Sequence, residues 1–139
     1  MSDDTPTVAP LPRRNADGTT TVTTLDAGDV RLVCPSWCVF QHGYRHPPAK
    51  AEITHRSEPE WALADTPEHG PTSLVEVALV QWPFSDRPQV CLSVETDDGH
   101  LEVGPTGAHR IAAALRKQAD HIDTMVDQLI SLRAEVTGR

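Results

Sequence analysis

The chain is poor in aromatic residues and contains no long apolar run. Aromatics make up 4% of its 139 residues, and hydrophobic residues make up 38%. No stretch approaches the roughly 20 consecutive apolar residues that a membrane-spanning helix needs. The N-terminus, MSDDTPTVAP, is polar and acidic and lacks the apolar centre of a secretory signal. These absences predict a cytoplasmic protein with no membrane association.

Cysteine is also scarce, and basic residues are outnumbered by acidic ones. Three cysteines are an odd number, and in a reducing cytoplasm they do not suggest a disulfide framework. The formal net charge is -8 at pH 7, from 12 basic and 20 acidic residues. An acidic surface repels the phosphate backbone and gains nothing from counterion release. The composition therefore argues against nucleic acid as a partner. The acidity either suits a basic or apolar protein surface or simply keeps a small domain soluble.

The familiar catalytic motifs are missing as well. The sequence has no phosphate-binding glycine loop, no G-x-S-x-G and no H-E-x-x-H. A zinc-dependent hydrolase would need a general base, and although Glu52 or Glu58 could serve, nothing in the sequence fixes either. A non-enzymatic function is therefore favoured.

One stretch, CPSWCVFQHGYRH at residues 34–46, concentrates the side chains that bind metals. Its spacing is C-x3-C-x3-H-x3-H, and the four residues are Cys34, Cys38, His42 and His46. Structural zinc takes four Cys or His ligands in a tetrahedron. The pattern predicts one structural Zn²⁺ per chain, with two cysteines and two histidines as ligands.

These ligands cannot all lie on one regular helix. Eight residues of helix advance about 12 Å, whereas a Cys and a His on one metal ion span roughly 10 Å between their Cα atoms. Pro35 favours an extended Cys34, and Gly43 is a common helix stop. We expect a short helical turn over about residues 35–42, broken at both ends.

Spacing and chemistry alone do not decide whether the fourth ligand is His46 or His55. His46 lies four residues after His42 but precedes two prolines that restrict its backbone. His55 would close a longer loop and join two chain segments.

Three aromatic side chains, Trp37, Phe40 and Tyr44, lie in the same stretch. We expect them to pack around the metal, the alternative being that Trp37 is exposed as an anchor for a partner. A thiol or zinc redox sensor is a second interpretation of the two cysteines. It is weaker because a dithiol redox motif has two intervening residues, and here there are three.

The rest of the chain predicts an α+β fold. Residues 1–27 are rich in Thr, Pro, Asp and Gly and are expected to form a disordered or loosely attached tail, although residues 19–25 are β-prone enough for an edge strand. The remainder forms one zinc-stapled domain: residues 28–139, with a knuckle over 28–59, a sheet over 60–104 and a helix over 105–136. The sheet is expected to be antiparallel, with three or four strands and a hairpin turn at residues 97–99.

The predicted C-terminal helix carries one apolar stripe and packs across the sheet. From Ala108 onwards it would be roughly 43 Å long, longer than a six-residue strand of about 20 Å. Part of the stripe therefore needs another cover. We expect either a homodimer through the helix, with a face formed by Met125, Leu129, Leu132 and Val136, or a helix whose last turns fray or that bends.

The motif C-P-x-W-C, followed by His42 and by the histidine of HRSEP, resembles the motif of a known family. These are small uncharacterised domains frequent in Streptomyces, in related actinobacteria and in their phages. The likeness covers roughly residues 30–135 and includes an ARxLAxAL-like segment at residues 108–115. It implies that the second histidine is the one before Ser-x-Pro, which is His55, and it implies no activity. The sequence thus predicts a cytoplasmic zinc-binding module that acts through contacts with a protein partner, in a regulatory role.

Overall fold

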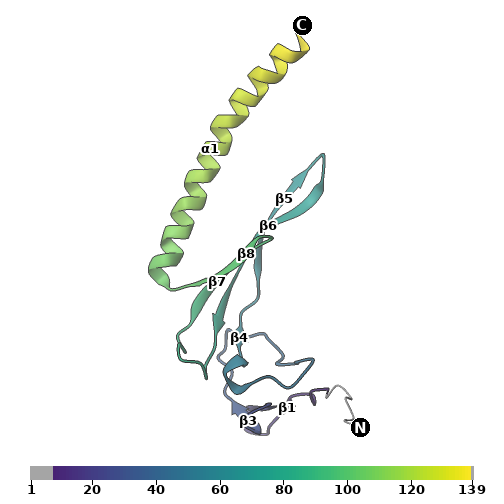
Figure 1. The fold of residues 1–139 in the computed structure, drawn as a ribbon, viewed down its shortest axis with the longest axis vertical. Coiled ribbons are helices and arrows are strands. Elements are labelled where there is room, and N and C mark those ends of the chain that lie inside the picture. Colours follow the sequence, from purple (N-terminus) through teal and green to yellow (C-terminus); the bar gives the residue numbers. More distant parts are fainter. Residues whose placement is uncertain (1–7, 139) are drawn as a thin grey trace, which may run out of the picture. The chain divides into compact units, whose positions relative to one another are not determined.

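Within residues 8–138, the chain forms two antiparallel sheets and one long helix (Figure 1). The computed structural model describes residues 8–138. The first sheet has three strands in the order β1-β2-β3, and the second has five, in the order β4-β6-β7-β8 with β5 also paired to β6. The strands are β1 (Arg13–Arg14), β2 (Thr20–Thr23), β3 (Asp29–Leu32), β4 (His55–Arg56), β5 (Glu60–Thr66), β6 (Gly70–Gln81), β7 (Cys91–Thr96) and β8 (Gly99–Val103). The predicted α+β class, with a small antiparallel sheet and one C-terminal helix, is confirmed.

The small sheet lies partly in the segment that was expected to be a loose tail. Strand β2 is its central strand and pairs with β3 from Thr20↔Leu32 to Thr23↔Asp29. Val22 is only 3% exposed. The structure therefore differs from the expectation at residues 8–27, because β2 buries Val22 and is hydrogen-bonded to a strand on each side. Residues 1–7 of the predicted tail lie outside the described residues.

The core of this region is a cluster of four buried residues. Two come from β3, one from β2 and one from the segment between the two sheets; they are Val22, Val30, Leu32 and Ile53. Tyr44 and Phe84, which are partly buried, pack against the cluster. A short 3-10 helix, η1 (Lys50–Glu52), precedes Ile53. The cluster thus connects the small sheet to the segment that leads into β4.

The larger sheet is built around β6, its longest strand. β6 pairs with β7 from Glu76↔Glu95 to Val80↔Cys91, and with β5 along its other edge. Val80 is fully buried. The predicted turn joins β7 to β8 at Asp97 and Asp98. The sequence predicted one sheet, and the structure separates the N-terminal strands into a second.

Helix α1 (Pro105–Thr137) belongs to a second compact unit of the chain and is described by itself. Pro105 stands in its first turn, where its missing N–H has no partner to lose. The N–H of Gly138 donates to the carbonyl of Ala134 and closes the helix. Packing of the helix across the sheet stays a prediction. Within residues 8–138, no helix combines the length and apolarity that crossing a membrane would require.

Candidate metal centre

Three of the predicted ligands lie on the loop that follows β3. Cys34 comes two residues after the strand ends, and the N–H of Cys38 donates to the carbonyl of Pro35 at 3.0 Å, which closes a tight turn. The short helix expected over residues 35–42 is wrong, because the chain makes this single turn and then runs irregularly to His42. His42 has a φ of 55°, in the left-handed region. Histidine is among the non-glycine residues that adopt this region more readily than most, and the reversal turns its ring back towards the cysteines.

The fourth member of the group comes from a different part of the fold. His55 begins β4, which pairs with β6 through His55↔Gln81 and Arg56↔Val80. The N–H of Val39 donates to the carbonyl of Arg56 at 2.8 Å and holds the loop beside this strand. The four side chains therefore connect the loop after the small sheet to an edge strand of the larger sheet.

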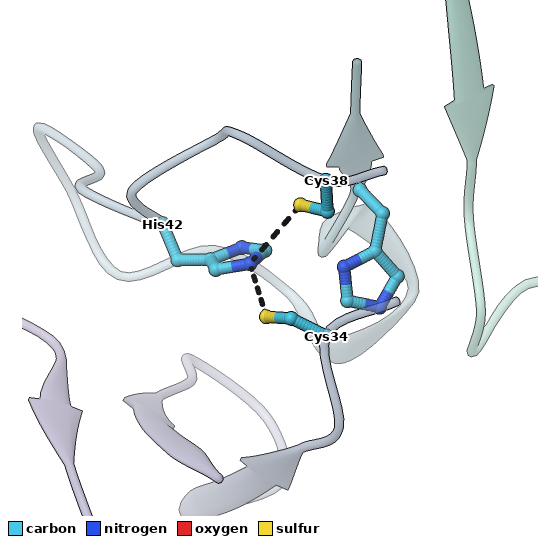
Figure 2. Close-up of side chains that lie close together, drawn as sticks. Cys34, Cys38 and His42 are labelled. Carbon is cyan, nitrogen blue, oxygen red and sulfur yellow. Dashed lines mark hydrogen bonds between the residues drawn. The ribbon is translucent and has the colours of Figure 1, made fainter. Parts of the chain in front are cut away.

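The ligand atoms lie at separations that suit one metal ion. Nε2 of His42 is 3.2 Å from Sγ of Cys34 and 3.9 Å from Sγ of Cys38 (Figure 2). One ligand atom from each of Cys34, Cys38, His42 and His55 lies within 4.8 Å of the others. A tetrahedron with zinc bonds of 2.0–2.3 Å has edges of roughly 3.3–3.8 Å. Adjustments of less than about 1 Å would bring the four atoms onto one zinc ion.

Burial sets the protonation of both imidazoles. His42 is 2% exposed and His55 is 3% exposed. Burial, and secondly the neighbouring His55, lowers the pKa of His42 to about 4. Burial likewise lowers the pKa of His55. Both rings are therefore neutral at pH 7, which is the form that binds a metal.

The thiols and the ring nitrogens also fit a metal. Burial, followed by the adjacent Cys38, raises the pKa of the Cys34 thiol, so this sulfur keeps its proton until a metal displaces it. The Nδ1 atoms of His42 and His55 are buried without a hydrogen-bond partner. The ion would bind His42 through Nε2, the ring nitrogen beside the sulfur atoms, and that bond would offset part of the cost of burying the ring. The buried Nδ1 of His42 would keep no partner in the metal-bound form.

His46, the alternative fourth ligand, is exposed and stands outside this group of ligand atoms. The third cysteine, Cys91, is in β7 and is likewise not a member. The structure therefore brings together the set that the resemblance implied. His42 and His55 are separated in sequence by Gly43 and by Pro47-Pro48. They come together because β4 places His55 beside the loop.

The three predicted packing residues surround the histidines. The Trp37 ring meets the His55 ring edge-on at 6.4 Å between centroids, and Phe40 lies 5.1 Å from His42. Tyr44 packs on Phe40 at 5.6 Å, and its hydroxyl accepts a hydrogen bond from the N–H of Thr54 at 3.4 Å. Aromatic rings thus cover the imidazoles and exclude water from them, as a metal centre of a small domain requires.

A cavity of about 610 Å³ opens beside the sulfur atoms. Its wall includes Cys34, Cys38 and His42 from the loop, and Arg14 and Thr20 from the small sheet. It provides a route by which an ion could enter. Sequence reasoning missed Arg14 and Thr20 because it placed both in the loose tail, and the β-prone residues 19–25 were the available signal.

The fold and this cluster define a class: a small α+β protein with a candidate Cys2His2 metal centre. The chain belongs to a family described as a domain of unknown function (DUF6907), whose sequence model matches residues 19–131. The predicted membership in a family of uncharacterised domains is confirmed at this level, and the match begins in front of β2 rather than at residue 30. Comparisons with curated proteins and with solved structures gave no match.

Proposed function

We propose that this protein is a small zinc-binding module in which one structural Zn²⁺ joins the two sheets. The observation that carries the proposal is the origin of the ligands. Cys34, Cys38 and His42 follow the small sheet, and His55 belongs to the larger one. A metal ion bound by all four residues would join segments that are otherwise connected by few backbone hydrogen bonds. The free energy of metal binding would then add to the free energy of folding.

The donor set favours a structural role over a catalytic one. Two thiolates and two imidazoles fill the four positions of tetrahedral zinc, whereas a catalytic zinc keeps one position for water or substrate. The net charge of -8 makes a nucleic-acid partner unfavourable. We propose that the module acts in the cytoplasm through contacts with protein, in regulation.

Exposed apolar side chains support the contact role. Trp61, Leu63 and Leu74 of the β5–β6 hairpin are each more than half exposed. Exposed groups of large apolar side chains commonly mark protein-binding surfaces.

Metal content of purified protein tests the zinc proposal. We expect about one zinc per chain, measured by elemental analysis, and loss of nearly all of it in Cys38→Ser. Cys91→Ser is the matched control, because it removes a thiol outside the cluster and should keep its zinc. A structural ion also predicts that Cys38→Ser melts at a lower temperature than Cys91→Ser. Full zinc content in Cys38→Ser would end the proposal.

One observation favours a second candidate, redox-controlled release of the metal. Cys34 is an exposed member of the cluster and lines the cavity beside it, so an oxidant can approach its partly buried sulfur. A sensor would release zinc under mild peroxide while the larger sheet stays folded. Retention of zinc until the whole protein unfolds would exclude the sensor and leave the structural site.

A further inference from the structure

Helix α1 carries a heptad repeat of apolar side chains, which we call the seam. Its members follow alternating steps of three and four residues through about four heptads of the 33-residue helix. The seam consists of Ala108, Ile111, Leu115, Gln118, Ile122, Met125, Leu129, Leu132 and Val136. Eight of these nine positions are apolar. A repeat sustained over three to four heptads is typical of helices that pair in a coiled coil.

The seam is exposed along most of its length. No residue of α1 is buried. The exposed fraction is 56% at Ile122, 63% at Met125 and 51% at Leu129. A helix that stays polar on one side and apolar on the other gains its stability from a partner on the apolar side. The charge distribution of α1 indicates which partner fits the seam.

The charges of α1 are divided between its two halves. Residues 105–119 contain three basic residues and no acidic one, whereas residues 120–137 contain four acidic residues and one basic residue. The basic ones are Arg110, Arg116 and Lys117, and the acidic ones are Asp120, Asp123, Asp127 and Glu135. This order is opposite to the one that stabilises a single helix, since the helix dipole favours acidic residues near the start and basic ones near the end. The first turn has no acidic residue and the last turn no basic one.

We propose that a second copy of this chain docks on the seam in antiparallel orientation. In that orientation the basic half of each helix lies beside the acidic half of the other, whereas a parallel pair would place like charges side by side. The charged residues lie outside the seam, so they act through their summed potential and not through ion pairs. The proposal goes beyond the zinc centre and does not depend on it.

Gln118 interrupts the apolar seam. It is the single polar member of the seam, and it lies near the middle of the repeat. With the two-fold axis near Ile122, the middle of the seam, each Gln118 lies about one helical turn from the axis and about two turns from the other Gln118.

Two substitutions of the same residue type test the seam. Ile122→Lys places a charge in the seam, and Ile130→Lys places the same charge on the flank, where Ile130 is 62% exposed. We expect the zinc-loaded full chain to be a dimer in analytical ultracentrifugation at about 50 µM. Ile122→Lys should raise its dissociation constant by roughly 100-fold or more, and Ile130→Lys should leave it within about threefold. Lysine is a good helix former, so circular dichroism should show α1 intact in both variants.

Equal dissociation constants for the two variants would overturn the proposal. A monomeric wild-type chain would also overturn it, and this is the result expected if the seam packs against another part of its own chain. Zinc content measured on the same samples separates this proposal from the previous one. A monomer with one zinc per chain overturns the pairing alone, and a dimer without zinc overturns the metal centre alone.

A second measurement tests the orientation. Asp123→Asn combined with Asp127→Asn removes charge from the acidic half and makes the chain less negative overall. In an antiparallel pair the attraction is lost, and we expect the dissociation constant to rise by about threefold at low salt. In a parallel pair the same change removes repulsion, so tighter association would overturn the antiparallel orientation.

Discussion

Sγ of Cys34 lies 3.2 Å from Nε2 of His42, although the two residues are eight positions apart. Eight residues of regular helix would advance about 12 Å, too far for a shared metal ion. The turn at Pro35 and the left-handed backbone of His42 shorten that distance. The irregular loop is therefore what brings a thiol and an imidazole into the separation that one ion needs, and metal binding and loop conformation should depend on each other.

The fourth ligand can be tested with two histidine variants. His55→Ala removes a ring that is 3% exposed and lies in the cluster, whereas His46→Ala removes an exposed ring outside it. We expect zinc affinity to fall on the order of 100-fold or more in His55→Ala and to stay within about twofold in His46→Ala. Competition with a chromophoric chelator measures both. Weaker binding in His46→Ala together with normal binding in His55→Ala would show that the fourth ligand is assigned wrongly.

Proton release on metal binding should reveal the two lowered histidine pKa values. The pKa of His42 is lowered to about 4 by burial and then by His55, and burial lowers that of His55. The pKa of about 4 leaves His42 without a proton at pH 7 and at pH 5.5, and the lowered pKa of His55 makes that ring bind a proton less readily than an ordinary histidine does. We expect about two protons released per zinc at pH 7, from the thiols, and no more than about three at pH 5.5, measured by titration calorimetry in buffers of different ionisation enthalpy.

Histidines with the ordinary pKa of about 6.5 would release more protons on zinc binding at low pH. They would be mostly protonated at pH 5.5, and the number of released protons would approach about four as the pH falls. A rise of that size between pH 7 and pH 5.5 would contradict the burial of the two rings.

Sequence alone predicted the elements that have a strong local pattern. β6, β7, β8 and α1 carry period-two or heptad-like apolar spacing; the sheet region, the turn between β7 and β8 and the helix lie where they were expected. Three of the clustered side chains were predicted from spacing and metal reach. His55 required the resemblance, because its place beside the loop depends on the pairing of β4 with β6, which leaves no local signal.

The N-terminal strands show where local composition misleads. β2 buries Val22 against Val30 and Leu32, and its remaining side chains are mostly threonines. A segment with so few apolar residues has the composition of a loose tail. What holds it is a core that includes Ile53, 31 positions after Val22. Packing between residues so far apart cannot be predicted from the segment itself.

The small-sheet core should dominate the stability of the N-terminal region. Leu32 is 1% exposed and packs in the cluster with Ile53, whereas Leu25, seven residues earlier, is 76% exposed. We expect Leu32→Ala to lower the free energy of unfolding by about 2–5 kcal/mol. Leu25→Ala should change it by no more than about 0.5 kcal/mol. Urea denaturation with zinc in excess measures both, and similar values for the two variants would mean that the small sheet carries no core of its own.

Alkylation of the cysteines should report which thiols bind the metal. Cys34 is exposed, and Cys38 and Cys91 are half-buried, so iodoacetamide can reach all three to different degrees in metal-free protein. Zinc converts Cys34 and Cys38 into coordinated thiolates, which react slowly, and it leaves Cys91 in β7 unchanged. We expect zinc to slow modification of Cys34 and Cys38 by at least about tenfold and that of Cys91 by less than about twofold, measured by peptide mass spectrometry. Because all three thiols are compared in one sample, a general tightening of the fold would slow Cys91 as well. Equal protection of the three would therefore point to folding without coordination and would count against the metal centre.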